Sequence, residues 1–491
     1  MAERSSGILM HITSIPSPYG IGTFGIEAYN FVDFLEKSGQ KYWQILPVGP
    51  TSYGDSPYMS FSSFAGNPYF IDLDLLAEDG LLSIEDYKNI DFGDDNKVDY
   101  GKIFVNKMPV LKVAYENGKN KYKEQILKFK EDNKEWLEDY SLYMAVKNEF
   151  GLKPWHEWDE DIKLREESAL KKYKEKLKYE IEYWNFLQYL FFQQWINLKT
   201  YANEKGIKII GDIPIYVAND SADTWANNEI FLLDERNSPT KVAGCPPDAF
   251  SSTGQLWGNP LYNWEVLEKR GFDWWIERIG GNIKLYDVIR IDHFRGFESF
   301  WSIPYGDKTA ENGKWVKGPG MKLFNAIRKE IGEVNIIAED LGFLTEDTIQ
   351  LREDSGYPGM KVLQFAFDPR EESDYLPHNY NKNCVVYTGT HDNDTINGWL
   401  ETVDKTDLNL AINYLKLTEE EGYNWGFIRG AWSSVGDLAI AQMQDFLGLG
   451  SEARMNIPST LGGNWQWRVK KEKLTDDLAN RIYDMTMLYG R

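Results

Sequence analysis

Eight short apolar runs, most of them separated by long amphipathic stretches, predict an α/β protein of the (β/α)8 TIM-barrel class. Each run is rich in β-branched residues and nearly continuous in hydrophobicity, which is typical of strands buried on both faces of a sheet. Parallel neighbours need crossover connections, and the amphipathic stretches are long enough to supply them as helices. The runs begin at Gly7, Tyr42, Ile207, Asp287, Asn335, Met360, Cys384 and Leu438.

Two of the crossover helices have clear ends. Residues 26–38 show helical periodicity up to Gly39, and the aromatic-rich residues 182–204 show it up to Gly206. A glycine directly after such a pattern is a common helix stop. We therefore expect a helix in each interval.

The whole chain, residues 1–491, is predicted to form a single catalytic domain with two insertions. Residues 72–180 are rich in Lys, Glu and Asp, have helical periodicity and lack a buried-strand run, so a helical insertion subdomain is expected there. Residues 213–264 are rich in Gly, Pro and Asn and are too long for a plain loop. We expect this second, loop-rich insertion to overhang the active face of the barrel.

Composition argues against several classes of partner. The formal net charge of -22 disfavours binding to nucleic acid and to anionic membranes. No apolar run of about 18 residues is present, so no membrane span is expected. The two cysteines, Cys245 and Cys384, lie far apart in the sequence, which favours a reducing, cytoplasmic location. Aromatic residues make up 15% of the chain, and although most should fill the core, flat aromatic faces also suit sugar rings.

Four predicted strands end in a carboxylate, at Asp212, Asp292, Glu339 and Asp392. In barrel enzymes the C-terminal strand ends meet on one face, so these residues are expected at a single site. Cleavage of a glycosidic bond needs two carboxyl groups in opposite roles, and a third can stabilise the charge that develops on the sugar. Any one strand-end acid could instead cap a helix or form an ion pair, but four together favour glycoside chemistry.

Strand alternation separates the roles of two of these acids. Side chains two positions apart share a face, so Arg290 and Asp292 should both point into the barrel. The guanidinium would keep Asp292 ionised, which favours it as the nucleophile. Glu339 follows three apolar residues, and it is therefore the better candidate for the acid.

Two other patterns are considered and set aside. Gly20, Gly22 and Gly25 form a GxGxxG motif after a strand, but no acidic residue follows the second strand before Asp55, so a dinucleotide site is not expected. The five histidines form no HxxxH or HExxH pair, so no metal is expected. No cofactor is implied. His293 and His391, beside the acids, could donate to sugar hydroxyls as neutral imidazoles.

Four motifs together resemble the amylomaltases, the 4-alpha-glucanotransferases related to the α-amylase clan. They are GDIPIYVANDSADTW from Gly211, RIDHFRG from Arg290, AEDLG from Ala338 and GTHDNDT from Gly389. The resemblance runs nearly end to end, from HITSIPSPYGIGTFG to NIPSTLGGNWQWR. Because the motifs are long and occur in the same order, the resemblance is highly specific.

The resemblance implies that Asp292 forms a covalent glucosyl-enzyme intermediate and that Glu339 is the general acid/base. Asp392 would bind sugar hydroxyls and stabilise the transition state, with Asp394 as a rival for that role. Positions that contact the sugar or support the carboxylates match Tyr58, Asp212, Arg290 and His391.

Residues 243–258 resemble the family's loop over the glucan cleft, with Phe250, Gln255 and Trp257 as expected contacts. Such a loop could exclude water while an acceptor enters, or it could simply cross the barrel rim. Asn464 is expected to contact substrate as well. In NIPST, Ser459 stands where the family is expected to have glycine, which puts the local backbone shape in doubt.

The function implied is transfer of a segment of an α-1,4-glucan to a new 4-position by a retaining mechanism. Maltooligosaccharides, glycogen or starch would be the substrates. An α-amylase-like hydrolase could use the same acids, but about 45 residues follow the last strand, too few for the C-terminal β-sandwich such enzymes usually carry. A non-catalytic glucan-binding protein would be expected to lack one of the acids. Tyr53 and Tyr100 are weaker candidates for an outer glucan-holding surface.

Overall fold

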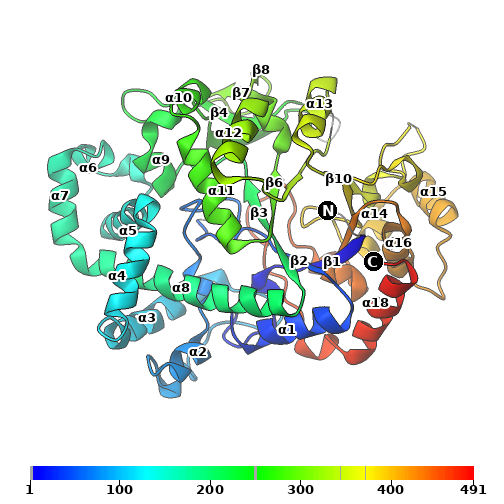
Figure 1. Cartoon of the computed structure of the whole chain (residues 1–491), viewed down its shortest axis with the longest axis horizontal. Helices are drawn as coiled ribbons and strands as arrows, with labels where there is room; N and C mark the ends of the chain where they lie inside the picture. The colour runs from blue at the N-terminus through cyan, green and yellow to red at the C-terminus, as the bar shows by residue number, and fades with distance from the viewer. Residues whose placement is uncertain (1–3, 53, 248–250, 343, 371) are drawn as a thin grey trace.

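Eight parallel strands form the centre of the molecule. The computed structural model describes residues 4–52, 54–247, 251–342, 344–370 and 372–491, and is shown in Figure 1. The sheet has the order β10-β11-β12-β1-β2-β3-β6-β9. Its strands are β1 (Ser5–Leu9), β2 (Tyr42–Gln44), β3 (Lys208–Pro214), β6 (Val288–Asp292), β9 (Ile336–Ala338), β10 (Gly359–Val362), β11 (Cys384–Tyr387) and β12 (Leu438–Gln442). The backbone N–H of Ala338 donates to the carbonyl of Pro358 at 2.9 Å, which brings the two outer strands together. The predicted (β/α)8 barrel is confirmed, and each of the eight apolar runs overlaps one of its strands.

Helices surround the barrel and provide most of the crossovers. The two helices predicted with clear ends are α1 (Ile26–Lys37) and α8 (Lys178–Glu204), and α8 begins four residues before the predicted start at residue 182. Further crossover helices are α11 (Asp273–Leu285), α12 (Met321–Ile331), α13 (Glu346–Ser355) and α16 (Tyr423–Ser433). The C-terminal helix α18 (Asp476–Leu488) lies beside α1 at the lower right of Figure 1.

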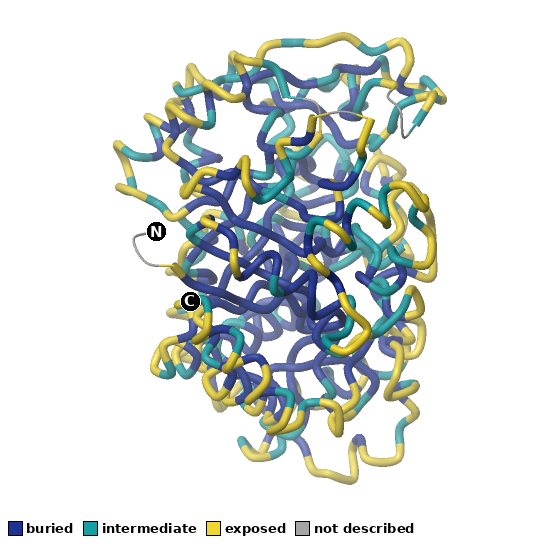
Figure 2. The backbone as a smooth tube through the Cα atoms, turned by 90° about the vertical axis from the view of Figure 1, so that its right-hand side faces the viewer, coloured by how far each residue is buried: buried dark blue, intermediate teal, exposed yellow. Residues whose placement is uncertain are grey.

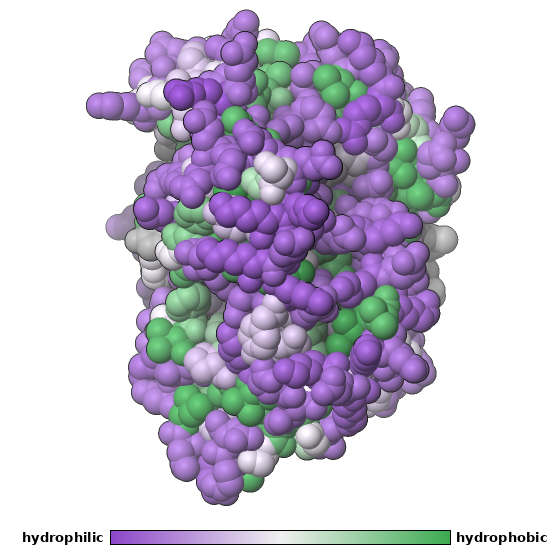
Figure 3. Space-filling model, turned by 90° about the vertical axis from the view of Figure 1, so that its left-hand side faces the viewer, coloured by the Kyte–Doolittle hydropathy of each residue, from purple (hydrophilic) through white to green (hydrophobic). Residues whose placement is uncertain are grey.

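A group of helices separates β2 from α8 and lies at the left of Figure 1. Its members are α2 (Leu73–Glu78), α3 (Tyr100–Gly118), α4 (Lys123–Asp132), α5 (Lys134–Glu149), α6 (Glu160–Lys163) and α7 (Glu167–Lys176). The face that they present to solvent is mainly hydrophilic in Figure 3, as the density of Lys, Glu and Asp in this interval requires.

A second sheet of four antiparallel strands was not predicted. It has the order β5-β4-β7-β8, with β4 (Lys241–Cys245), β5 (Gln255–Pro260), β7 (Ser299–Pro304) and β8 (Lys314–Lys317). Residues 213–264, expected to be loop-rich, supply β4 and β5, whose other partners come from after β6. A Cβ on Gly244 would lie 2.2 Å from the carbonyl oxygen of Gln255, so glycine allows this close approach of β4 and β5.

Most of the abundant aromatic residues fill the core. Figure 2 shows the barrel strands as the buried centre of the chain. The largest fully buried side chains include Trp43, Trp195, Trp275 and Trp432. Among the described residues, we find no helix with the length and apolar character needed to cross a bilayer.

Candidate active site

The four predicted acids lie near the C-terminal ends of barrel strands. Asp212 lies within β3, Asp292 ends β6, Glu339 follows β9, and Asp392 lies in the loop after β11. The register pairs Asp212 with Arg290 across β3 and β6. The backbone N–H of Glu339 donates to the carbonyl of Ile291 at 3.1 Å, which aligns the ends of β6 and β9.

Arg290 links two carboxylates inside the barrel. Its Nη1 donates to Oδ2 of Asp212 at 2.6 Å, and its Nη2 donates to Oδ1 of Asp292 at 3.1 Å. Arg290 and Asp212 are buried, whereas the side chain of Asp292 is 31% exposed. The guanidinium fork fixes both acids and leaves the Asp292 carboxylate accessible. This is the arrangement expected from strand alternation.

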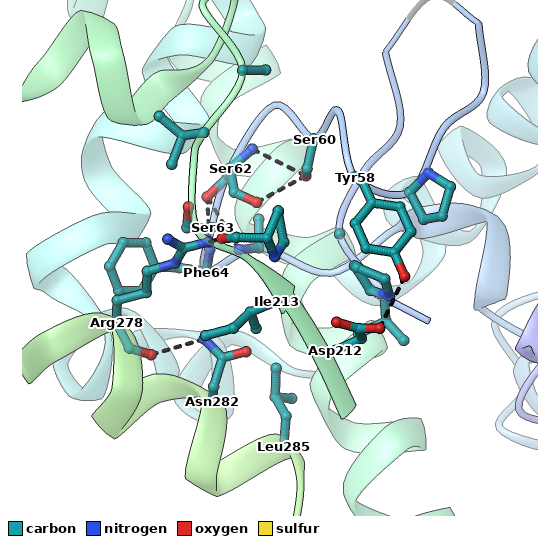
Figure 4. Close-up of a pocket in the computed structure, with 18 of the residues that line it drawn as sticks. Tyr58, Ser60, Ser62, Ser63, Phe64, Asp212, Ile213, Arg278, Asn282 and Leu285 are labelled. Atoms are coloured by element: carbon teal, nitrogen blue, oxygen red, sulfur yellow. Dashed lines mark hydrogen bonds between the residues drawn. The ribbon is translucent and has the colours of Figure 1, made fainter. Parts of the chain in front are cut away.

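Tyr58 binds the same carboxylate of Asp212 that Arg290 binds. Its hydroxyl donates to Oδ2 of Asp212 at 2.9 Å, as Figure 4 shows. The Tyr58 ring stacks on the ring of His391, with centroids 5.0 Å apart and planes at 17°. A cleft lies beside Tyr58 and Asp212, and the polar side chains that line it include Ser60 and Asn282. Of the described residues that line it, none is Asp292, Glu339 or Asp392, so the cleft adjoins these carboxylates rather than containing them.

Glu339 lies next to the backbone of the residue that follows Asp292. Its Oε2 accepts the backbone N–H of His293 at 2.6 Å, and its Oε1 accepts the backbone N–H of Leu341 at 3.1 Å. Burial, and then the negative charge of Asp292, raise the pKa of Glu339 to about 7, against the opposing effect of Arg290 and the two N–H groups. A carboxyl group with this pKa can deliver a proton near neutral pH and take one back.

The loop after β11 places Asp392 beside His391. Oδ1 of Asp392 accepts Nδ2–H of Asn456 at 2.6 Å, and Oδ2 lies 3.5 Å from Nε2 of His391. Arg454 donates to the main-chain oxygen of Asp392 at 2.7 Å. The Asp392 side chain is 43% exposed, so it can reach a ligand.

Asp394 is differently placed. Its Oδ2 accepts the hydroxyl of Ser451 at 2.7 Å, and its Oδ1 accepts the backbone N–H of Thr395 at 2.8 Å. The side chain is 14% exposed. Both carboxylate oxygens of Asp394 accept hydrogen bonds from the protein, and its side chain is less exposed than that of Asp392. The geometry therefore favours Asp392 over Asp394 as the third acid.

Among the other expected contacts, Trp257 and His293 lie together. Trp257 meets His293 edge-to-face with centroids 4.8 Å apart, and its indole N–H donates to Oε1 of Gln255 at 3.1 Å. Burial lowers the pKa of His293 to about 4, so its imidazole is neutral near pH 7. Phe250 lies outside the described residues.

Asn464 forms hydrogen bonds within the loop of residues 457–464. It accepts the backbone N–H of Ile457 at 3.0 Å and donates to the Thr460 hydroxyl at 3.0 Å. These hydrogen bonds lie within residues 457–464 and do not reach the four acids, so the expected contact of Asn464 with substrate remains a prediction. Ser459 in the same loop has φ 63°, so the left-handed backbone is kept although the residue is not glycine.

Two tyrosines and the GxGxxG segment were also singled out in the sequence. Tyr100 is buried and donates to the carbonyl of Trp465 at 2.8 Å, so its prediction as part of an exposed glucan-holding surface is wrong. Tyr53 lies outside the described residues. In the GxGxxG segment a Cβ on Gly22 would lie 1.7 Å from the carbonyl oxygen of Ile12, so this glycine is needed for packing of the chain on itself.

Sequence reasoning missed two neighbours of the site. Asn456 donates to Asp392, and Trp465 lies 5.9 Å from the rings of both Tyr58 and His391. Both belong to the C-terminal motif NIPSTLGGNWQWR, and that membership was the available signal. Within the described part of the chain, no cluster of three His, Cys, Asp or Glu residues is arranged to hold a metal ion.

Comparison with known proteins agrees with this geometry. A family profile described as 4-alpha-glucanotransferase matches residues 10–475. A 4-alpha-glucanotransferase of Clostridium butyricum is 61% identical over 98% of this chain and 100% of its own length, and one of Streptococcus pneumoniae is 53% identical over 100% and 98%. The solved structure of an amylomaltase from Streptococcus agalactiae in complex with acarbose matches with a TM-score of 0.98 at 46% identity, covering 100% of both chains. An amylomaltase structure from Corynebacterium glutamicum, 17% identical with a TM-score of 0.81 over 99% of this chain and 75% of its own, shares the fold. A strand-end cluster of carboxylates on a (β/α)8 barrel and these full-length similarities lead to one conclusion: the chain belongs to the 4-alpha-glucanotransferase family.

Proposed function

We propose that this chain transfers a segment of an α-1,4-glucan to the 4-position of glucose or of another α-1,4-glucan, by a retaining double displacement. The observation that carries the proposal is the pairing of an Arg290-bound, accessible Asp292 with the adjacent Glu339, whose pKa is raised to about 7. An ionised nucleophile beside a protonated acid is what the first step requires.

In the first step Glu339 gives its proton to the glycosidic oxygen while a carboxylate oxygen of Asp292 attacks the anomeric carbon. The bond to the leaving glucan breaks, and a glycosyl ester of Asp292 forms. Asp392 and His391 bind the hydroxyls of the sugar, and the Asp392 carboxylate stabilises its positive charge. Arg290 keeps Asp292 oriented throughout.

In the second step the 4-hydroxyl of an acceptor sugar attacks the same carbon. Glu339, now ionised, takes the hydroxyl proton, and Asp292 leaves as a carboxylate. Two inversions give net retention. Water in place of the sugar would give hydrolysis.

Maltooligosaccharides, glycogen or starch are the proposed substrates. The related Streptococcus agalactiae amylomaltase is in complex with acarbose, which supports a saccharide as the substrate of this chain. The net charge of -22 supports a partner that is not nucleic acid. The two cysteines of the sequence, Cys245 and Cys384, lie far apart along the chain, which supports a cytoplasmic location.

The helices of residues 72–180 are proposed to act as an insertion subdomain on one catalytic domain, and residues 213–264 to cover the active site. Contact between Trp257 of β5 and His293, next to Asp292, supports the second assignment. Gln255 and Trp257 would then meet the glucan from the side of the antiparallel sheet.

Incubation with maltotriose alone tests the function. Transfer yields glucose together with a ladder of longer maltodextrins, resolved by chromatography. Products that only become shorter would identify an α-amylase-like retaining hydrolase instead. Binding of maltotriose with no change in its length would identify a non-catalytic glucan-binding protein.

A further inference from the structure

A buried carboxylate outside the proposed chemistry contacts both ends of the loop that carries His391 and Asp392. Asp445 lies in the short helix α17 (Met443–Phe446), which directly follows β12, and it is fully buried. Its Oδ2 accepts the hydroxyl of Thr388 at 2.7 Å, and its Oδ1 accepts the backbone N–H of Ile396 at 2.8 Å. Thr388 immediately follows β11, and Ile396 begins α14 (Ile396–Thr402). One side chain therefore bridges the start and the end of the loop.

Asp445 is itself held in place from the adjoining helix. Asn424 of α16 donates its side-chain N–H to the main-chain oxygen of Asp445 at 2.7 Å. A second hydrogen bond joins α14 to the segment that carries Asp445, because Asn397 donates to the carbonyl of Gly448 at 2.8 Å. Asp445 is thus held by a helix of the barrel, and the end of the loop is held to the same segment at a second point.

Residues 389–395 span the interval between the two bridged positions. Near the middle of that interval Asp392 reaches Asn456 and His391. The position of the Asp392 carboxylate depends on the path of this backbone, and the path depends on where its ends are fixed. A displacement of about 1 Å in a reacting group can cost about 100-fold in rate.

We propose that Asp445 is a positioning residue, which sets the placement of Asp392 by tying together the two ends of its loop. The inference rests on the proposed function, because it assigns Asp445 a role in the same reaction. Asp445 acts through the backbone and does not touch the sugar.

The chemistry of the bridge suggests a conservative replacement. Burial raises the pKa of Asp445 to about 7, with nearby Asp394 contributing, against the opposing effect of the two hydrogen bonds. The protonated acid can still accept from Ile396 while donating to the Thr388 hydroxyl, which both donates and accepts. Asparagine has the same shape and the same two capacities, so Asp445→Asn should keep the bridge, whereas Asp445→Ala removes it.

The two contacts can also be removed one at a time. Thr388→Val deletes the hydroxyl with little change in volume. Ile396→Pro deletes the N–H donor at the first position of α14, where proline fits a helix, and Thr395 before it already has the extended backbone that proline requires, with φ -60° and ψ 158°. Ile396→Val keeps the N–H and is the matched control for the loss of side-chain volume.

The test measures kcat and KM for maltotriose, and the melting temperature, for each variant and for the parent protein. We expect Asp445→Ala and Ile396→Pro each to lower kcat by about 10 to 100-fold with KM changed by less than about 3-fold. Asp445→Asn and Ile396→Val should stay within about 3-fold of the parent protein. Lower melting temperatures with an unchanged kcat in the folded variants would show a merely structural role and overturn the inference. If Asp445→Ala does not fold, Ile396→Pro and Thr388→Val decide the question.

A double-mutant cycle with Asp392→Asn separates this inference from the proposed function. If Asp445 acts through Asp392, Asp445→Ala should have little further effect on the residual rate of Asp392→Asn, measured with an activated glycosyl fluoride donor. Additive losses would overturn the positioning role while leaving the proposed function intact. Full transfer activity in Asp392→Asn alone would instead contradict the role proposed for Asp392.

Discussion

The backbone N–H of His293 donates to Oε2 of Glu339 at 2.6 Å, so the residue after the proposed nucleophile binds the proposed acid. His293 adopts a left-handed backbone, with φ 55° and ψ 49°, which β-strand geometry would not allow. The chain turns at this point from β6 into the loop, and the turn places the peptide N–H toward the end of β9. Asp292 and Glu339 are therefore coupled through the backbone as well as through charge.

The raised pKa of Glu339 predicts how the rate depends on pH. Glu339 must be protonated to donate to the leaving oxygen, so kcat/KM for maltotriose should fall as pH rises through about 7. Initial rates of glucose release between pH 5 and 9 provide the measurement. A rate that stays constant up to pH 9 would contradict the assignment of Glu339 as the acid.

Removal of the charge on Asp292 should change that pKa. In Asp292→Asn the like charge that raises the pKa of Glu339 is gone, so the pKa should move down toward its ordinary value of 4.5. Carbon NMR of labelled glutamate carboxyl groups can follow the titration in this variant. Glu339→Gln identifies the resonance by its disappearance.

Asp292→Asn should also abolish transfer. An amide cannot replace a carboxylate as the attacking group, so we expect kcat to fall by about three orders of magnitude or more while the fold is kept. Product chromatography and the melting temperature give the two readouts. Asp354→Asn, at an exposed position, is the matched control and should retain full activity. Near-normal transfer in Asp292→Asn would remove the proposed mechanism.

Arg290→Lys tests the fork between the two carboxylates. An ammonium group cannot reach Asp212 and Asp292 in the two directions that the guanidinium uses, at 2.6 and 3.1 Å. One acid would lose its partner in a buried setting, so we expect kcat/KM to fall by about 100-fold, together with a lower melting temperature. Steady-state kinetics check the first effect, and an unchanged kcat/KM would show that orientation of Asp292 does not depend on Arg290.

Sequence could predict the barrel because its strands carry their own signal. In β6, Ile289 and Ile291 alternate with Arg290 and Asp292, and this alternation alone predicted which side chains point inward. The common location of the four strand-end acids could be predicted because the C-terminal ends of all strands in a parallel barrel lie on one face. These features depend on local sequence pattern and on the common direction of the strands.

The remaining features depend on contacts that local pattern does not encode. The strands β4 and β5 are short, and Val242 pairs with Ile303 far along the chain, so the antiparallel sheet gave no continuous signal. Asn456 belongs to the site because its loop returns to Asp392. Local pattern does not distinguish Tyr100 from an exposed tyrosine, but in the fold it is buried and its hydroxyl donates to the carbonyl of Trp465 in the C-terminal segment.

His11 should make the stability of the protein depend on pH. It is 4% exposed, and its Nδ1 accepts the backbone N–H of Leu46 at 3.2 Å, so the ring must stay neutral at that nitrogen. Burial, and then the neighbouring His391, lower the pKa of His11 from 6.5 to about 3. Between these values the unfolded chain binds the proton and the folded one does not, so stability falls as pH falls below 6.5.

The size of this effect can be isolated with His11→Asn, because the amide oxygen can still accept from Leu46. From pH 7 to pH 5 the parent protein should lose about 2 kcal/mol of unfolding free energy through His11, and the variant should not. Other titrating groups, including His293 and Glu339, contribute to both proteins and cancel in the difference. Urea unfolding at the two pH values gives the free energies, with His156→Asn at an exposed position as the control. Equal pH slopes for parent and variant would mean that His11 is not held neutral in the folded protein, and its hydrogen bond from Leu46 would then have to be broken on protonation.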